Sequence, residues 1–159
     1  MKQSSFRRLE GRPGPKGEVF LWPSSAHATG RLKAKLFAAG LLPTKPRIAL
    51  CGLLFTKRDR HVTAEMLFEE AKQARIAVSL ATVYNTLRQF IQAGLLRPLA
   101  IDGTKLYFDT NVSNHQHFYL EDQCQLVDMP ANVRITNMPA PPKGYAIDRI
   151  DVVVRLRRN

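Results

Sequence analysis

The sequence predicts an α+β fold in which helices come first and strands follow. From residue 30 to about residue 94, apolar residues recur at helical spacing in four segments bounded by threonine, serine or glycine. Two short alternating runs, LLRPLAI and KLYFDT, then flank Asp102-Gly103, a dipeptide typical of hairpin turns. After about residue 110 the apolar runs are short and strand-like. Helices followed by a two-stranded hairpin is the order of a winged helix.

The first two helices are expected in residues 30–40 and from Thr44 onward. RLKAKLFAAG ends at Gly40, a natural C-cap. Its apolar face should carry Leu32, Leu36 and Phe37. Thr44 can cap the second helix, with Pro46 in the first turn, where a missing N–H costs nothing. Five residues of this helix are assigned to the core: Ile48, Ala49, Cys51, Leu53 and Leu54.

The third and fourth helices open at Thr63 and Ser79. The third, AEMLFEEAKQAR, is expected to bury Met66, Leu67 and Ala71. The fourth, SLATVYNTLRQFIQAG, carries an apolar stripe of Leu80, Val83, Leu87, Phe90 and Ile91. Uncharged polar residues occupy the rest of that helix: Thr82, Asn85, Thr86, Gln89 and Gln92. It is therefore a helix with one face for a core and another for hydrogen bonding.

The end of the chain is expected to form a small α/β unit. HFYLE and CQLVDM are short strand candidates, YAIDRIDVVVRLRR is a longer one, and the proline-rich PANVRITNMPAPPKG between them is a loop. Pro98 places its own strand at a sheet edge or bulge. The predicted organisation is a basic leader (1–29), a winged-helix DNA-binding domain (30–109) and a dimerisation and ligand-sensing domain (110–159). The last unit has too little core to stand alone, which favours pairing with a second copy.

The net charge of +11 is concentrated at the front of the chain. Residues 1–60 contain 13 Lys and Arg against three acidic residues, whereas residues 61–159 contain 11 against ten. Such asymmetry favours a polyanion partner, with double-stranded DNA as the first candidate. A solubilising tail is the alternative, because several of these basic residues lie in the leader.

The polar face of helix 80–93 is the predicted DNA-reading surface. Asn, Tyr, Thr and Ser side chains can meet base edges and phosphates in a major groove. The residues assigned to base or backbone contact on and around this helix are Ser79, Thr82, Tyr84, Asn85 and Arg88, with Arg97 at its far end. Lys45 and Arg47, at the start of the second helix, can reach neighbouring phosphates. A solvated helix face without a ligand is the alternative.

Four stretches of the chain resemble a known family. TKPRIALCGLLF, RHVTAEMLFEEA, VSLATVYNTLRQFIQAGLL and DGTKLYFDT are similar to the ferric uptake regulators, a family of bacterial transcription factors, over residues from about 31 to the end. Because it lacks the zinc cysteines, the chain resembles the iron response regulator branch of the family in particular. The resemblance implies a homodimeric winged-helix repressor or activator of iron-linked genes, with Tyr84 as a principal DNA contact. Asn85 stands where many members have arginine, which implies a different base preference.

A histidine pair suggests a metal site. His115 and His117 lie two residues apart, so on an extended strand their rings point to one face, although such pairs are often incidental. The resemblance implies a hinge site between the domains, with aspartate at both acidic positions. Its five ligands in this chain are His61, Asp109, His115, His117 and Asp128. Mixed nitrogen and oxygen ligands suit Zn²⁺, Fe²⁺ or Mn²⁺.

Other ligand sites of the family are not expected here. Asn114 and Gln116 occupy the positions of a second metal site. Leu120 and Gln123 stand where a C-x-x-C zinc pair would be, so we expect no Cys₄ structural zinc. The resemblance to the iron response branch also implies haem sensing, with His115 or His117 as the axial ligand and an unidentified haem-delivering partner. The chain has no Cys-Pro motif, and WPSSAH occupies the corresponding region.

Composition narrows the class of protein further. No apolar run approaches the roughly 20 residues that cross a bilayer, and two distant cysteines form no disulfide framework. We therefore expect a cytoplasmic protein without membrane contact. A metalloenzyme would need a base or nucleophile beside an open metal position, and no such constellation is present. The remaining alternatives are an RNA-associated basic protein and a metal-independent nucleic-acid-binding or structural dimer.

Overall fold

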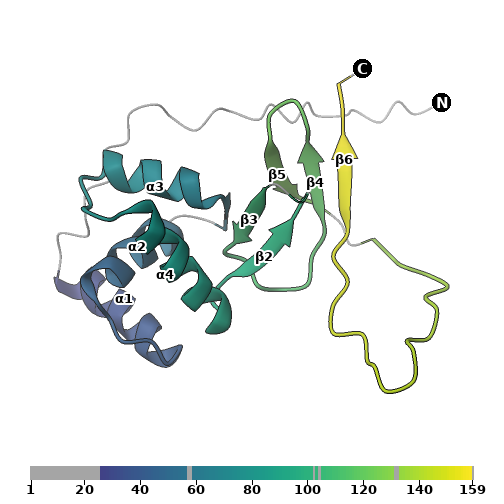
Figure 1. Ribbon diagram of the computed structural model, residues 1–159, viewed down its shortest axis with the longest axis horizontal. Coiled ribbons are helices and arrows are strands. Elements are labelled where there is room, and N and C mark those ends of the chain that lie inside the picture. The colour runs from purple at the N-terminus through teal and green to yellow at the C-terminus, as the bar shows by residue number, and fades with distance from the viewer. Residues whose placement is uncertain (1–25, 57–58, 102, 104, 131–132, 159) are drawn as a thin grey trace, which may run out of the picture.

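Helices come first along the chain and, apart from one short strand, the strands of two small sheets follow, which is the order that the sequence predicts. The computed structural model describes residues 26–56, 59–101, 103, 105–130 and 133–158. Its helices are α1 (Ala26–Ala38), α2 (Lys45–Phe55), α3 (Ala64–Gln73) and α4 (Leu80–Gln92). Its strands are β1 (His61–Val62), β2 (Arg97–Ala100), β3 (Leu106–Asp109), β4 (His117–Leu120), β5 (Gln125–Asp128) and β6 (Val153–Leu156). The helices gather at one end and β6 lies at the other (Figure 1).

The helix boundaries agree with the predicted caps, with two differences. The side chains of Thr63 and Ser79 accept hydrogen bonds from the third residue on, as N-caps do. Thr44 is also the N-cap of α2, but its side chain makes no capping hydrogen bond. One reason is that Pro46, at the second helical position, has no N–H to donate. The first helix begins at Ala26, earlier than predicted, so the expected leader ends within it, and its residues 1–25 lie outside the described residues.

Two buried assignments on the helices are wrong. Phe37 is 59% exposed and Met66 is 45% exposed. In each helix the neighbouring leucine, Leu36 or Leu67, is fully buried, as predicted. Because successive residues on a helix point about 100° apart, only one member of each pair can face the core centrally. Thr86 on α4 is the opposite error, since it is only 4% exposed although it was expected on the polar face.

The first sheet has the order β1-β3-β2, with antiparallel pairs throughout. β2 is an edge strand in this sheet, as Pro98 predicts. β2 and β3 pair as a hairpin, and Gly103 adopts a φ of 76° in the turn, which glycine accommodates readily. Asp102 lies outside the described residues. The predicted hairpin is therefore present.

The second sheet has the order β5-β4-β6, with β6 parallel to β4. The predicted strand over residues 145–158 is wrong in length, because only Val153–Leu156 is a strand. The length of β6 matches that of its neighbour, because β4 pairs with β6 only from His117 to Leu120 and thus offers four residues for pairing. Residues 133–150 lie exposed and contain no helix or strand.

The β2–β3 hairpin contributes to two separate cores. Phe108 belongs to the large core of the helices, whereas Leu99, Ile101 and Tyr107 pack with Tyr119 and Leu126 of the second sheet. Alternation along the strands causes this division, since successive side chains point to opposite faces. The hairpin therefore joins the helices to the second sheet, and the second sheet draws most of its small core from the hairpin.

A candidate metal centre at the junction of the two sheets

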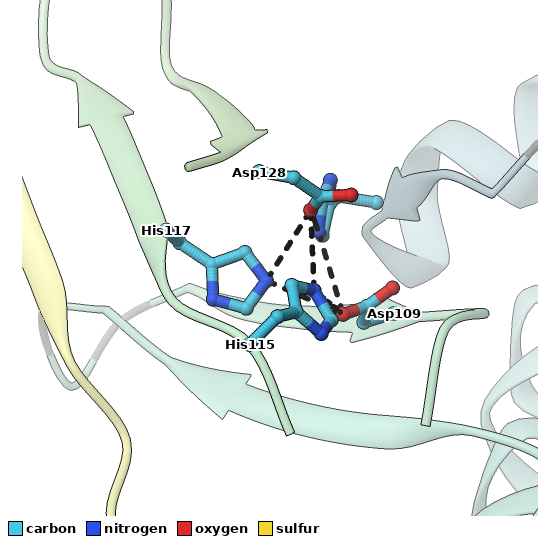
Figure 2. Close-up of side chains that lie close together, drawn as sticks. Asp109, His115, His117 and Asp128 are labelled. Carbon is cyan, nitrogen blue, oxygen red and sulfur yellow. Dashed lines mark hydrogen bonds and ion pairs between the residues drawn. The ribbon is translucent and has the colours of Figure 1, made fainter. Parts of the chain in front are cut away.

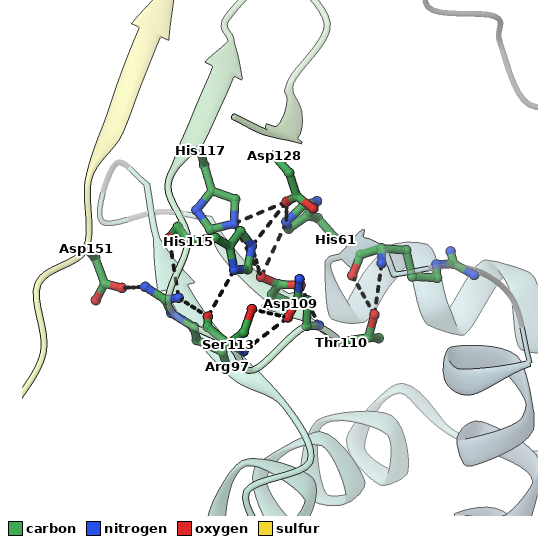
Figure 3. A network of polar contacts seen from close by, with 11 residues as sticks. His61, Arg97, Asp109, Thr110, Ser113, His115, His117, Asp128 and Asp151 are labelled. Atoms are coloured by element: carbon green, nitrogen blue, oxygen red, sulfur yellow. Dashed lines mark hydrogen bonds and ion pairs between the residues drawn. The ribbon is translucent and has the colours of Figure 1, made fainter. Parts of the chain in front are cut away.

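Five side chains converge at the junction of the two sheets. Each of them offers one ligand atom, and these atoms all lie within 4.8 Å of one another. They are the five residues expected from the sequence: His61, Asp109, His115, His117 and Asp128. Figure 2 shows His115, His117 and the two aspartates facing one another, and Figure 3 shows His61 among them.

Two strand ladders bring these residues together. In the first sheet His61 of β1 lies opposite Asp109, the last residue of β3. In the second sheet His117, the first residue of β4, lies opposite Asp128, the last residue of β5. His115 precedes β4 rather than lying on it, yet its ring centroid is 4.4 Å from that of His117. The site therefore contains one directly paired His and Asp from each sheet.

The two carboxylates approach the same three imidazole nitrogens. Oδ2 of Asp109 lies 3.5, 3.1 and 3.3 Å from Nε2 of His61, His115 and His117, respectively. Oδ1 of Asp128 lies 3.1, 3.2 and 3.6 Å from the same three atoms. All three Nε2 atoms thus point toward the space between the carboxylates.

Hydrogen bonds outside the cluster hold two of the ligands in place. Nδ1 of His115 lies 3.0 Å from the carbonyl oxygen of Ser113, to which it can donate. Such a bond leaves Nε2 as the atom with a free lone pair. The backbone N–H of Asn111 donates to Oδ1 of Asp109 at 2.8 Å, so the other carboxylate oxygen faces the histidines. The chain itself therefore orients the side chains of His115 and Asp109 toward the cluster.

The charge state of Asp109 follows from its surroundings. The side chain is completely buried. Burial raises the pKa of the Asp109 carboxyl, but the hydrogen bond with His117, the neighbouring His61 imidazole and the hydrogen bond from the Asn111 N–H outweigh burial and hold that pKa below its usual range. A fully buried carboxylate therefore remains ionised beside three imidazoles.

The donor set fits a divalent metal ion. Nε2 of His61 and of His115 are buried and have no hydrogen-bond partner among the described residues, although carboxylate oxygens lie 3.1–3.5 Å away. Ligand atoms about 2.1 Å from one ion and at right angles to each other lie about 3.0 Å apart, which is close to these spacings. Three nitrogens and two oxygens suit Zn²⁺, Fe²⁺ and Mn²⁺ and discriminate little among them.

The predicted DNA-contact residues fall into two groups. Tyr84, Asn85, Arg88 and Lys45 are exposed, with Tyr84 at 43%. The others have partners within the chain. Ser79 accepts from the N–H of Thr82 at 3.1 Å, so these two residues form the N-terminal cap of α4. Arg47 donates to Oε1 of Gln89 at 2.9 Å and to the carbonyl of Leu42 at 2.7 Å. Tyr84, Asn85, Arg88 and Lys45 thus present exposed surface, although the Tyr84 hydroxyl is bonded to Glu65.

Arg97 does not occupy the position that was expected for a phosphate contact. Its side chain is only 3% exposed and forms an ion pair with Asp151. The strand phase explains this placement, because Arg97 shares the inward face of β2 with Leu99. That phase was visible in the sequence as alternation and could have identified Arg97 as an inward residue.

Glu65 makes a contact near the predicted DNA-reading surface that the sequence pattern does not predict. It lies at the start of α3 and accepts a hydrogen bond from the hydroxyl of Tyr84. This bond raises the pKa of Tyr84 and lowers the pKa of Glu65, assisted by backbone and Thr63 hydrogen bonds to Glu65. The hydrogen bond connects the Tyr84 hydroxyl to the first turn of α3.

Replacing Tyr84 with phenylalanine is expected to raise the pKa of Glu65 toward its ordinary value of 4.5, because the hydroxyl donor is removed. The pKa of Glu65 is lower in the folded protein than in the unfolded chain. The bond therefore stabilises the fold at pH values above the ordinary pKa of the carboxyl. Its contribution is lost as the pH falls through the folded pKa. Carbon-13 NMR titration of the Glu65 carboxyl measures the change. An identical titration in both proteins would show that Tyr84 does not donate to Glu65.

Four helices with a two-stranded wing, an exposed polar face on α4 and a cluster of candidate metal ligands are typical of one class of protein: winged-helix transcription regulators that respond to metal. Comparison with known proteins agrees. Residues 38–142 match the model of the Ferric uptake regulator family, so the chain belongs to that family. Its members are metal-responsive regulators that bind DNA and act as dimers, and they are not enzymes, which removes the metalloenzyme alternative.

Individual relatives cover much of the chain. The ferric uptake regulation protein of Pseudomonas aeruginosa is 32% identical over 96 residues, which is 60% of this chain and 72% of that protein. The peroxide-responsive repressor PerR of Staphylococcus aureus is also 32% identical, over 95 residues. Those residues are 60% of this chain and 64% of PerR, which is less than two thirds of the repressor.

Solved structures of the family have the same architecture. A ferric uptake regulator from Pseudomonas aeruginosa, determined with manganese, has a TM-score of 0.60 and 26% identity. The match covers 79% of this chain and 96% of that one. The Vibrio cholerae ferric uptake regulator, at 22% identity and a TM-score of 0.63 over 79% of this chain and 98% of that one, shares the fold. In the described part of the chain, no helix is long and apolar enough to cross a membrane.

Proposed function

We propose that this protein is a sequence-specific regulator of iron-linked genes whose operator affinity depends on a divalent metal ion. The observation that supports this most strongly is the convergence of five ligand atoms, from both sheets, within 4.8 Å of one another. The manganese in the Pseudomonas aeruginosa structure gives independent support for a metal in this family. We also propose a cytoplasmic location, where operator DNA lies.

The proposed metal ligands connect the two halves of the chain. We place the division between the winged-helix and sensing domains at residues 109 and 110. His61 and Asp109 then belong to the winged helix, and His115, His117 and Asp128 to the sensing domain. A bound divalent ion supplies positive charge that attracts ligand atoms from both sides. The three histidines and two aspartates thereby hold the second sheet in one orientation against the helices, and that orientation determines where α4 lies in a dimer.

The DNA-binding side of the proposal relies on α4. Its exposed residues Tyr84, Asn85 and Arg88 are available to a major groove, and Lys45 of α2 is available to a phosphate. Ser79 and Thr82 present the N-terminus of α4, and Arg47 can reach DNA if it leaves Gln89. Two such helices in a symmetric dimer would read a pseudo-palindromic operator.

The dimer is proposed to form through the C-terminal part of the chain. Large apolar side chains lie exposed there although they could pack against a second copy. They include Val127, Tyr145, Ile147, Val154 and Leu156. The second sheet also has a small core of its own, as described above, so a partner would stabilise it.

Haem remains the second ligand that the resemblance implies. An axial bond would use Nε2 of His115 or His117, and in the described residues both atoms face the Asp109 and Asp128 carboxylates. This arrangement favours a small cation over a macrocycle. Metal and haem analysis of protein purified from its own cells distinguishes the two, and stoichiometric haem without metal would overturn the metal assignment.

The decisive experiment measures operator binding with and without metal. Duplexes selected from a random pool should bind the Mn²⁺- or Zn²⁺-loaded protein more tightly than the chelator-treated protein, with scrambled duplex and RNA as competitors. Equal competition by scrambled duplex or RNA would favour an RNA-associated or non-specific binder. Specific binding that is the same with and without chelator would favour the metal-independent alternative. The absence of any binding would favour a structural dimer.

Replacing Tyr84 with alanine is expected to lower operator affinity by roughly 10- to 100-fold, because a base or phosphate contact of α4 is removed. Fluorescence anisotropy with the selected duplex measures the effect. Gln73→Ala, an exposed change at the opposite end of α3 from Glu65, is the control and should bind like the unmodified protein. Wild-type affinity in Tyr84→Ala would remove α4 as the reading helix.

A further inference from the structure

Arg97 is a buried arginine at the junction of the two sheets. It is the first residue of β2 and lies opposite Asp109 in the first sheet. Only 3% of the residue is exposed. Figure 3 shows its guanidinium between Ser113 and Asp151, next to the histidine cluster. The arginine therefore lies beside the proposed metal site without offering a ligand to it.

The guanidinium of Arg97 contacts three residues outside its own strand. Nη1 donates to the carbonyl of Ser113 at 2.9 Å and lies 3.5 Å from the carbonyl of His115. Nη2 forms a charged hydrogen bond with Asp151, which precedes β6. One planar side chain thus connects β2, the backbone of His115 and the approach to β6.

The carbonyl of Ser113 has two donors. Arg97 donates to it, and Nδ1 of His115 lies 3.0 Å from the same oxygen. An acceptor held by a fixed partner keeps its position, so Nδ1 of His115 finds its acceptor in one place. Arg97 therefore acts on His115 through Ser113: it holds the oxygen that selects the Nδ1–H tautomer and directs Nε2 to the cluster.

Burial of this cation is unfavourable unless partners compensate it. The Nε atom of Arg97 is buried and has no hydrogen-bond partner in the part of the chain that the structure describes, so the compensation found there is incomplete. Asp151 supplies the opposite charge: burial raises the pKa of its carboxyl, but the hydrogen bond and charge of Arg97, together with Arg149, lower it further than burial raises it. A purely structural position in a strand would be filled more stably by an apolar residue, which suggests a second role.

We propose that Arg97 is a positioning residue of the metal site, which fixes the tautomer of His115 through Ser113 and ties that site to β6 through Asp151. The β6 connection matters because Val153 of β6 pairs with His117, another ligand of the cluster. The inference rests on the proposed metal-dependent function and adds to it a link from the site to the second sheet.

The test compares Arg97→Met with Arg149→Met. Arg149 also pairs with Asp151, at 2.9 Å, but its side chain is 42% exposed, and no contact with Ser113 or His115 is among its described interactions. Arg97→Met is expected to weaken Zn²⁺ binding by roughly 10- to 100-fold, the usual effect of losing an outer-shell partner. Arg149→Met should bind Zn²⁺ like the unmodified protein. Competition with a chromophoric chelator measures both affinities.

A second readout needs no metal. Nitrogen-15 NMR of the metal-free protein at pH 8, where imidazoles are ordinarily neutral, reports which nitrogen of His115 carries the proton. We expect the Nδ1–H tautomer in the unmodified protein and in Arg149→Met, and a mixture of tautomers in Arg97→Met. A structural role that merely stabilises β2 would leave this ratio unchanged.

Two further variants keep the test decisive. Arg97→Lys retains the charge but loses the planar fork, so it should show a smaller effect in the same direction, and it replaces Arg97→Met if that variant does not fold. Asp151→Asn should retain the His115 tautomer, because the Ser113 contact remains. A folded Arg97 variant with unchanged Zn²⁺ affinity and tautomer overturns the inference. A wild-type protein that binds no metal overturns the proposed function itself, whatever the variants do.

Discussion

Replacing His115 and His117 together with alanine is expected to abolish the metal-dependent change in operator binding. The double variant removes two of the three imidazole nitrogens that face the Asp109 and Asp128 carboxylates. Metal affinity should fall by more than about 100-fold, the upper range for changes that only touch the outer shell. Anisotropy with the selected duplex, at rising Mn²⁺ or Zn²⁺, measures the response.

His27→Ala is the matched control, because His27 is an exposed histidine on α1 and lies outside the cluster. It should retain the full metal response. His61→Ala is informative in a different way, since His61 is the one histidine of the cluster on β1, beside the helices. That variant should keep part of the metal affinity but lose most of its effect on operator binding. A double variant that responds to metal like the unmodified protein would disprove the sensing assignment.

Phe90→Ala is expected to destabilise the protein by about 3–5 kcal/mol, as large-to-small changes in a core do. Phe90 on α4 is completely buried, and its ring centroid lies 6.3 Å from that of Phe55 on α2. The change removes a side chain that α2 and α4 share and leaves a cavity between them. Urea unfolding monitored by circular dichroism, at one fixed protein concentration, measures the free energy of unfolding.

Phe37→Ala is the control for the same chemical change at an exposed site. Phe37 is 59% exposed on α1, so its replacement should alter the free energy of unfolding by no more than about 0.5 kcal/mol. Equal losses in the two variants would mean that Phe37 is covered in solution, as it would be if another chain packed on α1. The comparison thus also tests whether the helical end of the molecule is free.

Much of the fold was predictable because local rules apply to it. Helix caps at Thr63 and Ser79 and the hairpin around Gly103 follow from short-range geometry, and the structure contains them. Phe37 and Met66 were assigned to the core incorrectly because helical periodicity tolerates a shift of one residue at the edge of an apolar face. Burial at such an edge depends on the neighbouring helix, which the pattern of a single segment does not contain.

The candidate metal site was predictable only in part. The spacing of His115 and His117 indicated a pair on one face, and the resemblance to a family supplied His61 and the two aspartates. Their convergence depends on two ladders in different sheets, which pair residues far apart in the chain. A basic residue after a reading helix suggests a phosphate contact, so the local sequence favours DNA as the partner of Arg97. Its ion pair with Asp151 depends instead on the path of the chain into β6, which the local sequence does not contain.

The sequence by itself determined the order of helices and strands, the caps at Thr63 and Ser79, the hairpin turn and the pairing of His115 with His117 two residues apart. These properties depend on the chemistry of residues a few positions apart. The tertiary structure decided which of those residues face one another, which arginine is buried, and how short β6 is. Those outcomes depend on pairing between distant strands, where the free energy of each contact is set by what the rest of the chain places opposite it.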